Sequence, residues 1–409
     1  MDFRLDPAID QLRRRVRAFV EARLIPLEAD RANYDEHDNL REDVLARMRG
    51  EAREAGIWAL QSRKARGGGG LPFVAMAACY EEMNRSIFGP AAFNCAAPDD
   101  GNMMVLERVG SDAQKARWLD PIVDGRVRSS FAMTEPHPGG GSDPSMIRTT
   151  AKRRGERWVV HGRKWFITGA ATASHFLLIA RTSDDARKGH TAFMFHRDRP
   201  GWRLERRIPI MGPEEHGGHG ELSFDGLEIP DEDRLLGVGD GLKVAQIRLG
   251  PARLTHCMRW LGLARRSLEI ANAYVAERMS GGKRLAERES VQLMLGDAAI
   301  ELRIGRLLVM HAATRLDAGG MARTELSLAK VHVAGALHRA ADTAIQLCGG
   351  RGYSKDTPLE WIYRYARQAR LVDGASEVHR TVIAKSLTDA PDAFFDWNHV
   401  DPPKRSAPA

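Results

Sequence analysis

A glycine-rich segment in the middle of the chain has residue types that bind phosphate groups. Phe131-Ala132-Met133-Thr134-Glu135-Pro136 leads into Gly139-Gly140-Gly141-Ser142-Asp143. Glycines let backbone N–H groups approach a phosphate closely, and the hydroxyls of Thr134 and Ser142 could add further donors. The same residues would also form an ordinary glycine-rich loop. No G-x-G-x-x-G follows a predicted strand and no Walker loop occurs, so a Rossmann or P-loop site is not expected.

Two further groups of residues have chemical potential but ordinary explanations as well. Asp373-Gly374 stands before a helical segment, where an Asp-Gly pair is typical of a turn or an N-cap. His216-Gly217-Gly218-His219 offers two imidazoles that could bind a metal, but the surrounding sequence supplies no third ligand. We therefore predict no metal site.

The elements that must position these residues fall into three zones and a tail. Residues 1–125 have the periodicity of helices, with Ile9, Leu12 and Val16 on one face. Residues 126–238 contain short β-rich runs and predict a compact middle β domain, either a barrel or a sandwich. His161-Gly162 and Asp225-Gly226 lie between extended runs, and we expect each to form a hairpin turn.

Residues 239–395 predict long helices with short connections, which indicates an antiparallel bundle. The expected helices are Leu242 to Arg278, about Glu287 to Leu316, and about Thr324 to Cys348. Gly250-Pro251 predicts a kink in the first of them. Residues 396–409 form a tail.

Composition excludes several classes of protein. The 409 residues are 43% hydrophobic and 28% charged, as in an ordinary globular protein. No apolar run approaches the roughly 20 residues of a membrane-spanning helix, and the first residues have no signal-peptide h-region. The four cysteines have no metal-ligand or redox spacing, so we expect a cytoplasmic protein. The net charge of +7 would attract anions such as CoA, or serve solubility alone.

Four ordered segments resemble the signatures of the acyl-CoA dehydrogenase family. They are Phe131–Pro136 with Gly141–Asp143, Gly162-Arg163-Lys164-Trp165-Phe166-Ile167-Thr168-Gly169-Ala170, Cys348-Gly349-Gly350-Arg351-Gly352-Tyr353, and Asp373-Gly374-Ala375-Ser376-Glu377-Val378-His379-Arg380. The resemblance covers nearly the whole chain. It implies a mostly α protein with an N-terminal helical domain, a central β domain and a C-terminal four-helix bundle.

The resemblance also implies FAD at the junction of the β domain and the bundle. In this family, Met133, Thr134 and Ser142 would contact the flavin and its pyrophosphate. Phe166 would pack on the isoalloxazine, where the family usually has Trp, and Thr168 would lie near its reactive nitrogen. The other positions that the resemblance assigns to the cofactor in the same subunit are Phe131, Gly141, Ala375 and Glu377.

The family shares its FAD across a subunit interface, so the resemblance implies a homodimer or homotetramer. The matching positions are Arg278, Ser280, Gln346, Gly349 and Gly350. The sequence departs from the pattern at Gly281, where Phe is usual, and at Glu289, where Gln is usual.

Asp373 matches the position of the family's catalytic base, where Glu is usual. Some relatives carry the base at the position of Ala252, which cannot act as one. Residues 247–253, 256–259 and 216–219 are typical of a branch in which Asp is the usual base. By the same resemblance, Arg253 would help to place the Asp373 loop, and the acyl-CoA would contact Ser142, Arg253, Gly374 and Lys385.

The resemblance leaves three functions open. The first is α,β-dehydrogenation of an acyl-CoA, with an electron-transfer flavoprotein as electron acceptor. The second is a flavin oxidase of the same fold, acting on nitroalkanes or acyl-CoA. The third is a DNA-binding member of the superfamily. Arg364, Arg367 and Arg370 form a basic stripe, but no extensive interleaving of aromatic and basic residues accompanies it, so nucleic-acid binding is not expected.

Overall fold

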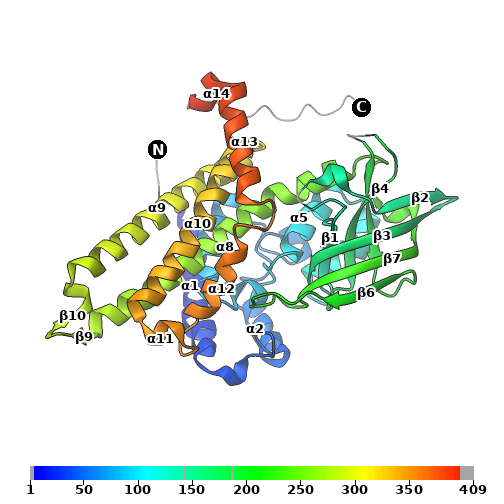
Figure 1. Ribbon diagram of the computed structural model, residues 1–409. Helices are drawn as coiled ribbons and strands as arrows, with labels where there is room; N and C mark the ends of the chain where they lie inside the picture. Colours follow the sequence, from blue (N-terminus) through cyan, green and yellow to red (C-terminus); the bar gives the residue numbers. More distant parts are fainter. Residues whose placement is uncertain (1–3, 142, 186–187, 397–409) are drawn as a thin grey trace.

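The computed structural model describes residues 4–141, 143–185 and 188–396. In Figure 1 the helices lie at the left and in the centre of the view, and the β sheet lies at the right. The N-terminal region is helical, as predicted. Its helices are α1 (Pro7–Phe19), α2 (Glu42–Glu54), α3 (Phe73–Met83), α4 (Gly89–Ala92), α5 (Asp99–Val109), α6 (Asp112–Gln114) and α7 (Asp120–Val123). Pro7 begins α1 at a position where its missing N–H costs nothing, and the Asp6 side chain accepts from Ala8 N.

The middle region is an eight-stranded sheet. Seven strands follow the order β6-β7-β3-β2-β4-β5-β8, and the eighth, β1, pairs with β4. The strands are β1 (Ser129–Ala132), β2 (Thr150–Arg154), β3 (Arg157–Thr168), β4 (His175–Arg181), β5 (His190–His196), β6 (Trp202–Arg207), β7 (His219–Pro230) and β8 (Arg234–Leu235). β4 and β5 are apolar along their length because both of their faces are buried.

The two predicted hairpin turns are wrong. His161-Gly162 lies inside β3 and Asp225-Gly226 lies inside β7, and the two strands pair side by side through these positions. The ladder shifts register between Val160 and His161, as a β-bulge does. Gly162 is needed there because a Cβ on it would stand 2.6 Å from the backbone of Thr149. Glycine therefore marked an irregularity within strands rather than their ends.

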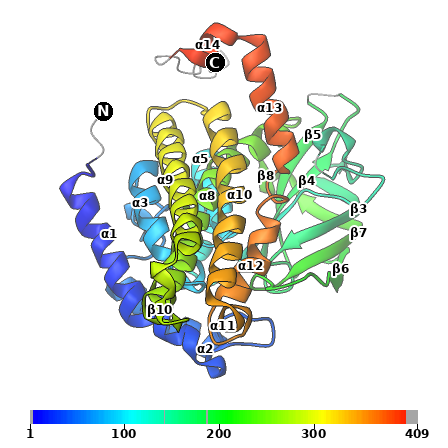
Figure 2. The same ribbon diagram turned by 60° about the vertical axis from the view of Figure 1, so that its left-hand side comes forward.

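The C-terminal region is the predicted helical bundle. Its long helices are α8 (Gly241–Glu277), α9 (Glu289–Asp317) and α10 (Arg323–Cys348), close to the expected bounds, and α8 continues through Pro251. Alanines at 329, 336, 340 and 344 are buried on α10 and let its neighbours approach closely. Figure 2 shows α9 and α10 side by side. The remaining elements are β9 (Met279–Ser280), β10 (Lys283–Arg284), α11 (Gly350–Tyr353), α12 (Leu359–Gln368), α13 (Ser376–Asp389) and α14 (Pro391–Phe395).

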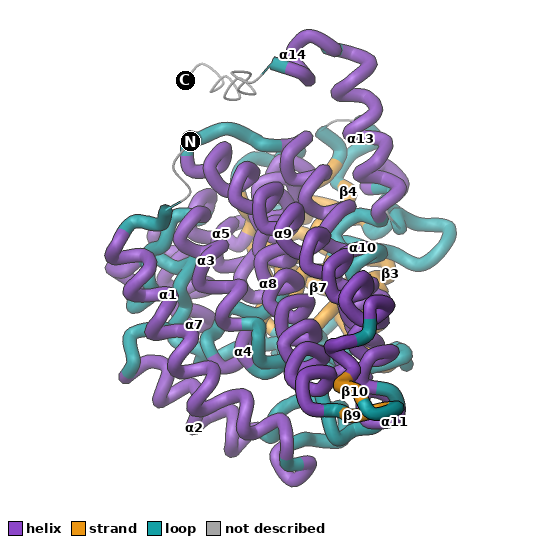
Figure 3. Tube along the Cα trace, turned by 90° about the vertical axis from the view of Figure 1, so that its left-hand side faces the viewer, coloured by secondary structure: helices purple, strands orange, loops and turns teal. Residues whose placement is uncertain are grey.

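Three regions of the chain share one buried junction. Leu106 of α5, Ile179 of β4 and Val244 of α8 belong to the same apolar cluster. Burying this surface fixes the sheet against the first turns of α8, behind the helices in the view of Figure 3. Within the described residues, no helix is long and apolar enough to cross a bilayer.

Candidate active site

A buried lysine fixes the segment that leaves β1. Lys164 is fully buried, and its Nζ donates to the Met133 carbonyl at 2.7 Å and to Glu135 Oε1 at 2.8 Å. The Thr134 carbonyl accepts from the backbone N–H of Trp165 at 3.0 Å. Burial lowers the pKa of Lys164 to about 8 against the opposing charge of Glu135. The segment of Met133 and Thr134 is thus held against β3, close to the end of that strand.

An aromatic ring and a hydroxyl end β3. Phe166 is 45% exposed and has a φ of +50°, a left-handed conformation that is strained for a bulky residue. Its ring lies edge-on to that of Trp165. Two residues on, Thr168 Oγ1 lies 3.0 Å from His219 Nδ1. The strained and exposed Phe166 ring, close to the hydrogen-bonded Thr168 hydroxyl, indicates a site for a flat ligand and not a side chain that packs in the core.

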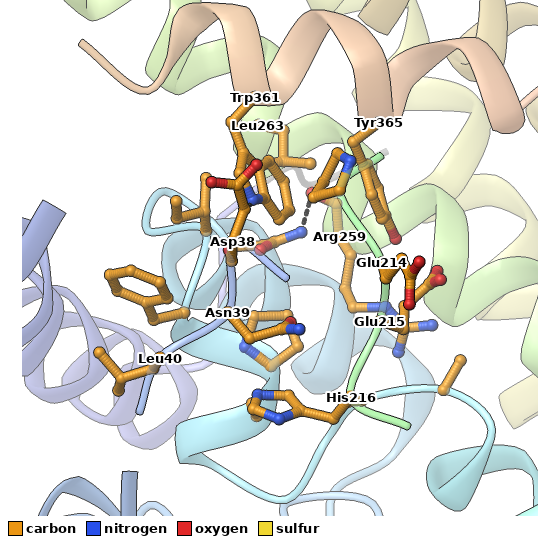
Figure 4. A pocket seen from close by; sticks show the side chains of 18 of the residues that line it. Asp38, Asn39, Leu40, Glu214, Glu215, His216, Arg259, Leu263, Trp361 and Tyr365 are labelled. Carbon is orange, nitrogen blue, oxygen red and sulfur yellow. Dashed lines mark hydrogen bonds between the residues drawn. The ribbon is translucent and has the colours of Figure 1, made fainter. Parts of the chain in front are cut away.

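A cavity of about 70 Å³ is lined by residues of α8, α12 and the segment before β7, among others (Figure 4). Glu214, Glu215 and His216 form one wall, with Arg259 and Tyr365 near them. Glu215 also approaches His219 Nε2 at 3.1 Å. The His219 side chain therefore connects Glu215, in the wall of the cavity, with Thr168.

The loop that carries Asp373 is held by its backbone. Asp373 has a φ of +53° and Gly374 a φ of +97°, both left-handed. Arg253 Nε donates to the Asp373 carbonyl at 2.9 Å, and Lys330 Nζ donates to the Gly374 carbonyl at 2.7 Å. His379 Nε2 lies 3.3 Å from the same Asp373 carbonyl. Arg253 accordingly contacts the Asp373 loop, where the resemblance places it.

The Asp373 carboxylate faces a buried basic wall. Its side chain is 18% exposed, with Oδ2 3.3 Å from His256 Nε2 and Oδ1 3.9 Å from Arg248. Burial lowers the pKa of His256 to about 4, so the ring is neutral at neutral pH. Burial also raises the pKa of Asp373, but His256, Arg248 and Arg253 outweigh this and hold it below its ordinary value. At neutral pH the two arginines are the charges that keep the carboxylate ionised.

Arg248 links the two halves of the site. Its guanidinium carbon lies 4.3 Å from the centroid of the Phe131 ring, while Nη1 approaches Asp373. Its Nε also donates to Asn102 Oδ1 of α5 at 3.1 Å. One buried side chain thus connects the β1 segment, the N-terminal region and the Asp373 loop.

A second group of predicted residues lies elsewhere. Arg278, Ser280, Gln346, Gly349 and Gly350 are all exposed, around the C-terminal ends of α8 and α10. β9, β10 and α11 mark this end of the bundle, away from the sheet (Figure 1). A Cβ on Gly349 or Gly350 would meet nothing within 4 Å. Within one chain the structure does not bring these residues to Phe166 and Thr168.

The remaining predicted residues lie around the loop and on α13. Ala375 is the N-cap of α13, Glu377 is exposed in its first turn, and Lys385 is exposed further along it. Gly141 is exposed with open space where a Cβ would stand. Ser142 lies outside the described residues.

Sequence reasoning missed four buried basic side chains. Lys164, Arg248, His256 and Lys330 were assigned no role, although all four contact the predicted site residues. A signal existed on α8, since Arg248, Ala252 and His256 follow one another at intervals of four and share one helix face. Arg248 and His256, the two polar residues of this row, indicate a shared polar partner.

Each of the three regions of the chain matches a domain of one known protein family. Models of the acyl-CoA dehydrogenase N-terminal, middle and C-terminal domains match residues 6–126, 130–227 and 239–388. Acyl-CoA dehydrogenase family member 11 of Gallus gallus is 36% identical over 386 residues, which cover 91% of this chain and 49% of that protein. The chain thus spans about half the length of this relative.

Other relatives match along their whole length. A probable acyl-CoA dehydrogenase of Mycobacterium tuberculosis is 34% identical, covering 94% of this chain and 97% of that one. The structure of a putative acyl-CoA dehydrogenase from Mycobacterium abscessus has a TM-score of 0.88 at 37% identity, covering 95% and 99%. Butyryl-CoA dehydrogenase from Megasphaera elsdenii has a TM-score of 0.82 at 26% identity, covering 95% and 100%. With three matching domain models and full-length relatives, this chain belongs to the acyl-CoA dehydrogenase family.

Proposed function

We propose that the protein is an FAD-dependent acyl-CoA dehydrogenase that forms a double bond between the α and β carbons of a CoA thioester. The observation that carries the proposal is the contact of Arg248 with both Phe131 and Asp373. It joins an ionised carboxylate to β1, and the segment that follows β1 is hydrogen-bonded to Trp165, next to Phe166 on β3. A base and a flat cofactor on two sides of one substrate are what this reaction requires.

The residues present fit FAD. Phe166 offers an exposed ring face, and Met133 and Thr134 are fixed beside it by Lys164 and the backbone of β3. Gly141 leaves space for close approach of a phosphate. When bound, FAD supplies the hydride acceptor that side chains lack.

Asp373 serves the reaction with both its side chain and its backbone. Its carboxylate removes the α-proton as general base. Among the described residues, no acceptor pairs with the Asp373 N–H, so this group is available to polarise the thioester carbonyl as charge develops on it. Arg253 and Lys330 hold the loop, so both groups stay in place. Gly374 and Lys385 would contact the acyl-CoA, together with Ser142.

The second half of the cofactor site comes from another copy of the chain in this proposal. Arg278, Ser280, Gln346, Gly349 and Gly350 would contact the partner's FAD, which makes the protein a homodimer or homotetramer. Exposed apolar side chains on α9 support an interface: Leu293, Ile300, Ile304 and Leu307 are 42–63% exposed. An electron-transfer flavoprotein would receive the electrons, and the four free, buried thiols suit a reducing cytoplasm.

The test is anaerobic mixing of the FAD-loaded protein with a panel of straight, branched and hydroxylated acyl-CoAs. We expect the flavin absorbance to bleach with at least one of them, and no oxygen consumption until an electron acceptor is added. Rapid oxygen consumption without an acceptor would assign the oxidase reaction instead. A colourless protein that cannot be reconstituted with FAD would overturn the proposal.

A further inference from the structure

We propose that His219, paired with Glu215, is a positioning residue that directs the Thr168 hydroxyl toward the flavin and couples reduction of the cofactor to uptake of a proton. The inference rests on the proposed placement of Thr168 beside FAD. It assigns a role to the His216–His219 segment, which the proposed reaction does not otherwise use.

The backbone fixes His219 opposite Thr168. β3 ends at Thr168 and β7 begins at His219, and the two residues are partners in the ladder. Gly217 and Gly218 have φ values of +84° and +57°, and Gly169 N donates to the Gly218 carbonyl at 2.7 Å. A Cβ on Gly217 would stand 2.7 Å from the Gly169 carbonyl oxygen. The two glycine turns therefore pack backbone to backbone, which leaves the imidazole little freedom.

The side chains form one continuous chain of contacts. Thr168 Oγ1 lies 3.0 Å from His219 Nδ1, and His219 Nε2 lies 3.1 Å from Glu215 Oε2. Gln368 of α12 donates to the other Glu215 oxygen at 3.0 Å. His219 is buried, at 7% exposure. The hydroxyl, the imidazole and the carboxylate therefore lie in one row, each within 3.1 Å of the next.

The charges around His219 favour its protonated form. Burial lowers its pKa, but Glu215, with help from Glu214, outweighs burial and raises the pKa above its ordinary value of 6.5. Glu214 also pairs with Arg207 of β6, so part of its charge is compensated there. Tyr365 of α12 lies beside Glu215 with a raised pKa and stays neutral. Glu215 is therefore the dominant charge facing the ring.

Protonation decides which way the hydroxyl points. An imidazolium carries N–H groups on both nitrogens, so Nδ1 must donate to Thr168 Oγ1 and the hydroxyl proton is directed away from His219. A neutral ring with a bare Nδ1 would accept that proton instead. Glu215 lines the cavity of Figure 4, which gives the pair a place to exchange protons.

The coupling to reduction follows from charge. Reduction by hydride adds negative charge to the cofactor, and a nearby cation stabilises that charge more than the oxidised form. Reduction of the cofactor must therefore raise the pKa of His219 by the same interaction energy, because the linkage between reduction and protonation is reciprocal. Between the His219 pKa values of the oxidised and reduced protein, reduction therefore takes up one additional proton. Below both values, His219 stays charged and no such uptake occurs.

The experiment compares proton uptake on anaerobic reduction of the FAD-loaded protein, with a pH indicator dye, across pH 6 to 10. His219→Asn removes the titrating ring, and the nearly isosteric Glu215→Gln removes the charge that raises the pKa of that ring. His161→Asn is the matched control, because His161 also lies beside an acidic residue, 3.3 Å from Asp225 across the β3–β7 ladder, but is exposed. We expect a pH-dependent extra proton in the wild type and in His161→Asn, its loss in His219→Asn, and its shift to lower pH in Glu215→Gln.

An identical proton count in all four proteins, with FAD bound in each, would overturn the role of His219 and leave the proposed dehydrogenase intact. If His219→Asn fails to fold, the nearly isosteric Glu215→Gln decides: an unchanged pH window of proton uptake in this variant would overturn the role of the His219–Glu215 pair. Protein that binds no FAD, or is not bleached by any acyl-CoA, would instead contradict the proposed function.

Discussion

Asp373 combines a left-handed backbone with a carboxylate that is kept ionised. Aspartate tolerates a positive φ better than most residues, because its short polar side chain adds little crowding. Arg253 and Lys330 bind the two carbonyls of the turn, so the strain is offset by charge-assisted hydrogen bonds. The loop is thereby preorganised before substrate arrives.

The first prediction concerns the length of the base. Asp373→Glu extends the carboxylate by about 1.5 Å, the scale of one bond length, and meets His256 and Arg248, which already lie within 4 Å. We expect retained FAD with flavin reduction slowed by about tenfold or more on the best substrate, since proton transfer tolerates little displacement. Stopped-flow absorbance measures it. A rate equal to the wild type would mean that reach does not constrain the base.

The second prediction concerns pH. The pKa of Asp373 is held low, so the base is active above that pKa and kcat/KM falls only as the pH drops through it. Arg248→Gln removes one of the charges responsible, and the acidic limb of kcat/KM should move to higher pH. The control Arg157→Gln, in the exposed pair with Glu228 on the sheet, should not move it. An unchanged limb in Arg248→Gln would show that Arg248 does not act on Asp373.

At the scale of elements, the junction of β1 and β3 depends on one buried ion pair. Lys164 and Glu135 are 0% and 3% exposed, and Glu135 also accepts from the backbone N–H groups of Arg148 and Thr149. Because the pair is enclosed and hydrogen-bonded, neither charge can be removed alone without leaving the other unpaired.

The third prediction follows from that enclosure. Glu135→Gln leaves the Lys164 ammonium without its counter-charge, and breaking a buried pair in this way costs about 3–5 kcal/mol. We expect a lower midpoint of thermal unfolding and weaker FAD retention. Glu228→Gln breaks the exposed Arg157 pair on the same sheet and should cost about 1 kcal/mol or less. Equal effects of the two changes would contradict a special role for Lys164.

The elements that could be predicted from the sequence are those with long periodic patterns. α8, α9 and α10 begin and end within about two residues of expectation because apolar residues repeat over many turns. The bulge at His161 and the left-handed Phe166 could not be predicted, because each depends on the strand packed against it. Arg248 was likewise assigned no role, since burial of an arginine depends on partners from α5 and the Asp373 loop.

At the scale of the whole molecule, the predicted site residues fall into two groups that lie apart within one chain. Arg248 joins Asp373 to Phe131 of β1, and the segment after β1 is hydrogen-bonded to β3, which carries Phe166 and Thr168. Arg278 and Gln346 instead lie exposed near the C-terminal ends of α8 and α10. The family resemblance assigns both groups to the cofactor or the substrate, and these assignments stay predictions. Their separation within a single chain is what the structure adds, and it favours an assembly in which the groups come from different copies.

The fourth prediction tests that assembly. We expect sedimentation to give a dimer or tetramer, and Arg278→Glu to weaken FAD binding by about ten- to a hundredfold, as loss of a charge-assisted contact of about 1.5–3 kcal/mol implies. Lys283→Glu makes a similar charge change at the same end of the bundle and should leave FAD binding nearly unaltered. A monomer with full FAD occupancy would contradict the shared site.

The central claim is that Asp373 removes the α-proton of an acyl-CoA. The most direct measurement is the rate of anaerobic flavin bleaching in Asp373→Asn, on the substrate that bleaches the wild type fastest. The amide is nearly isosteric and keeps the backbone N–H, but it cannot accept the proton. We predict that FAD stays bound while bleaching slows by about 10²–10⁴-fold. Bleaching at the wild-type rate would mean that Asp373 is only a turn residue and that another group is the base.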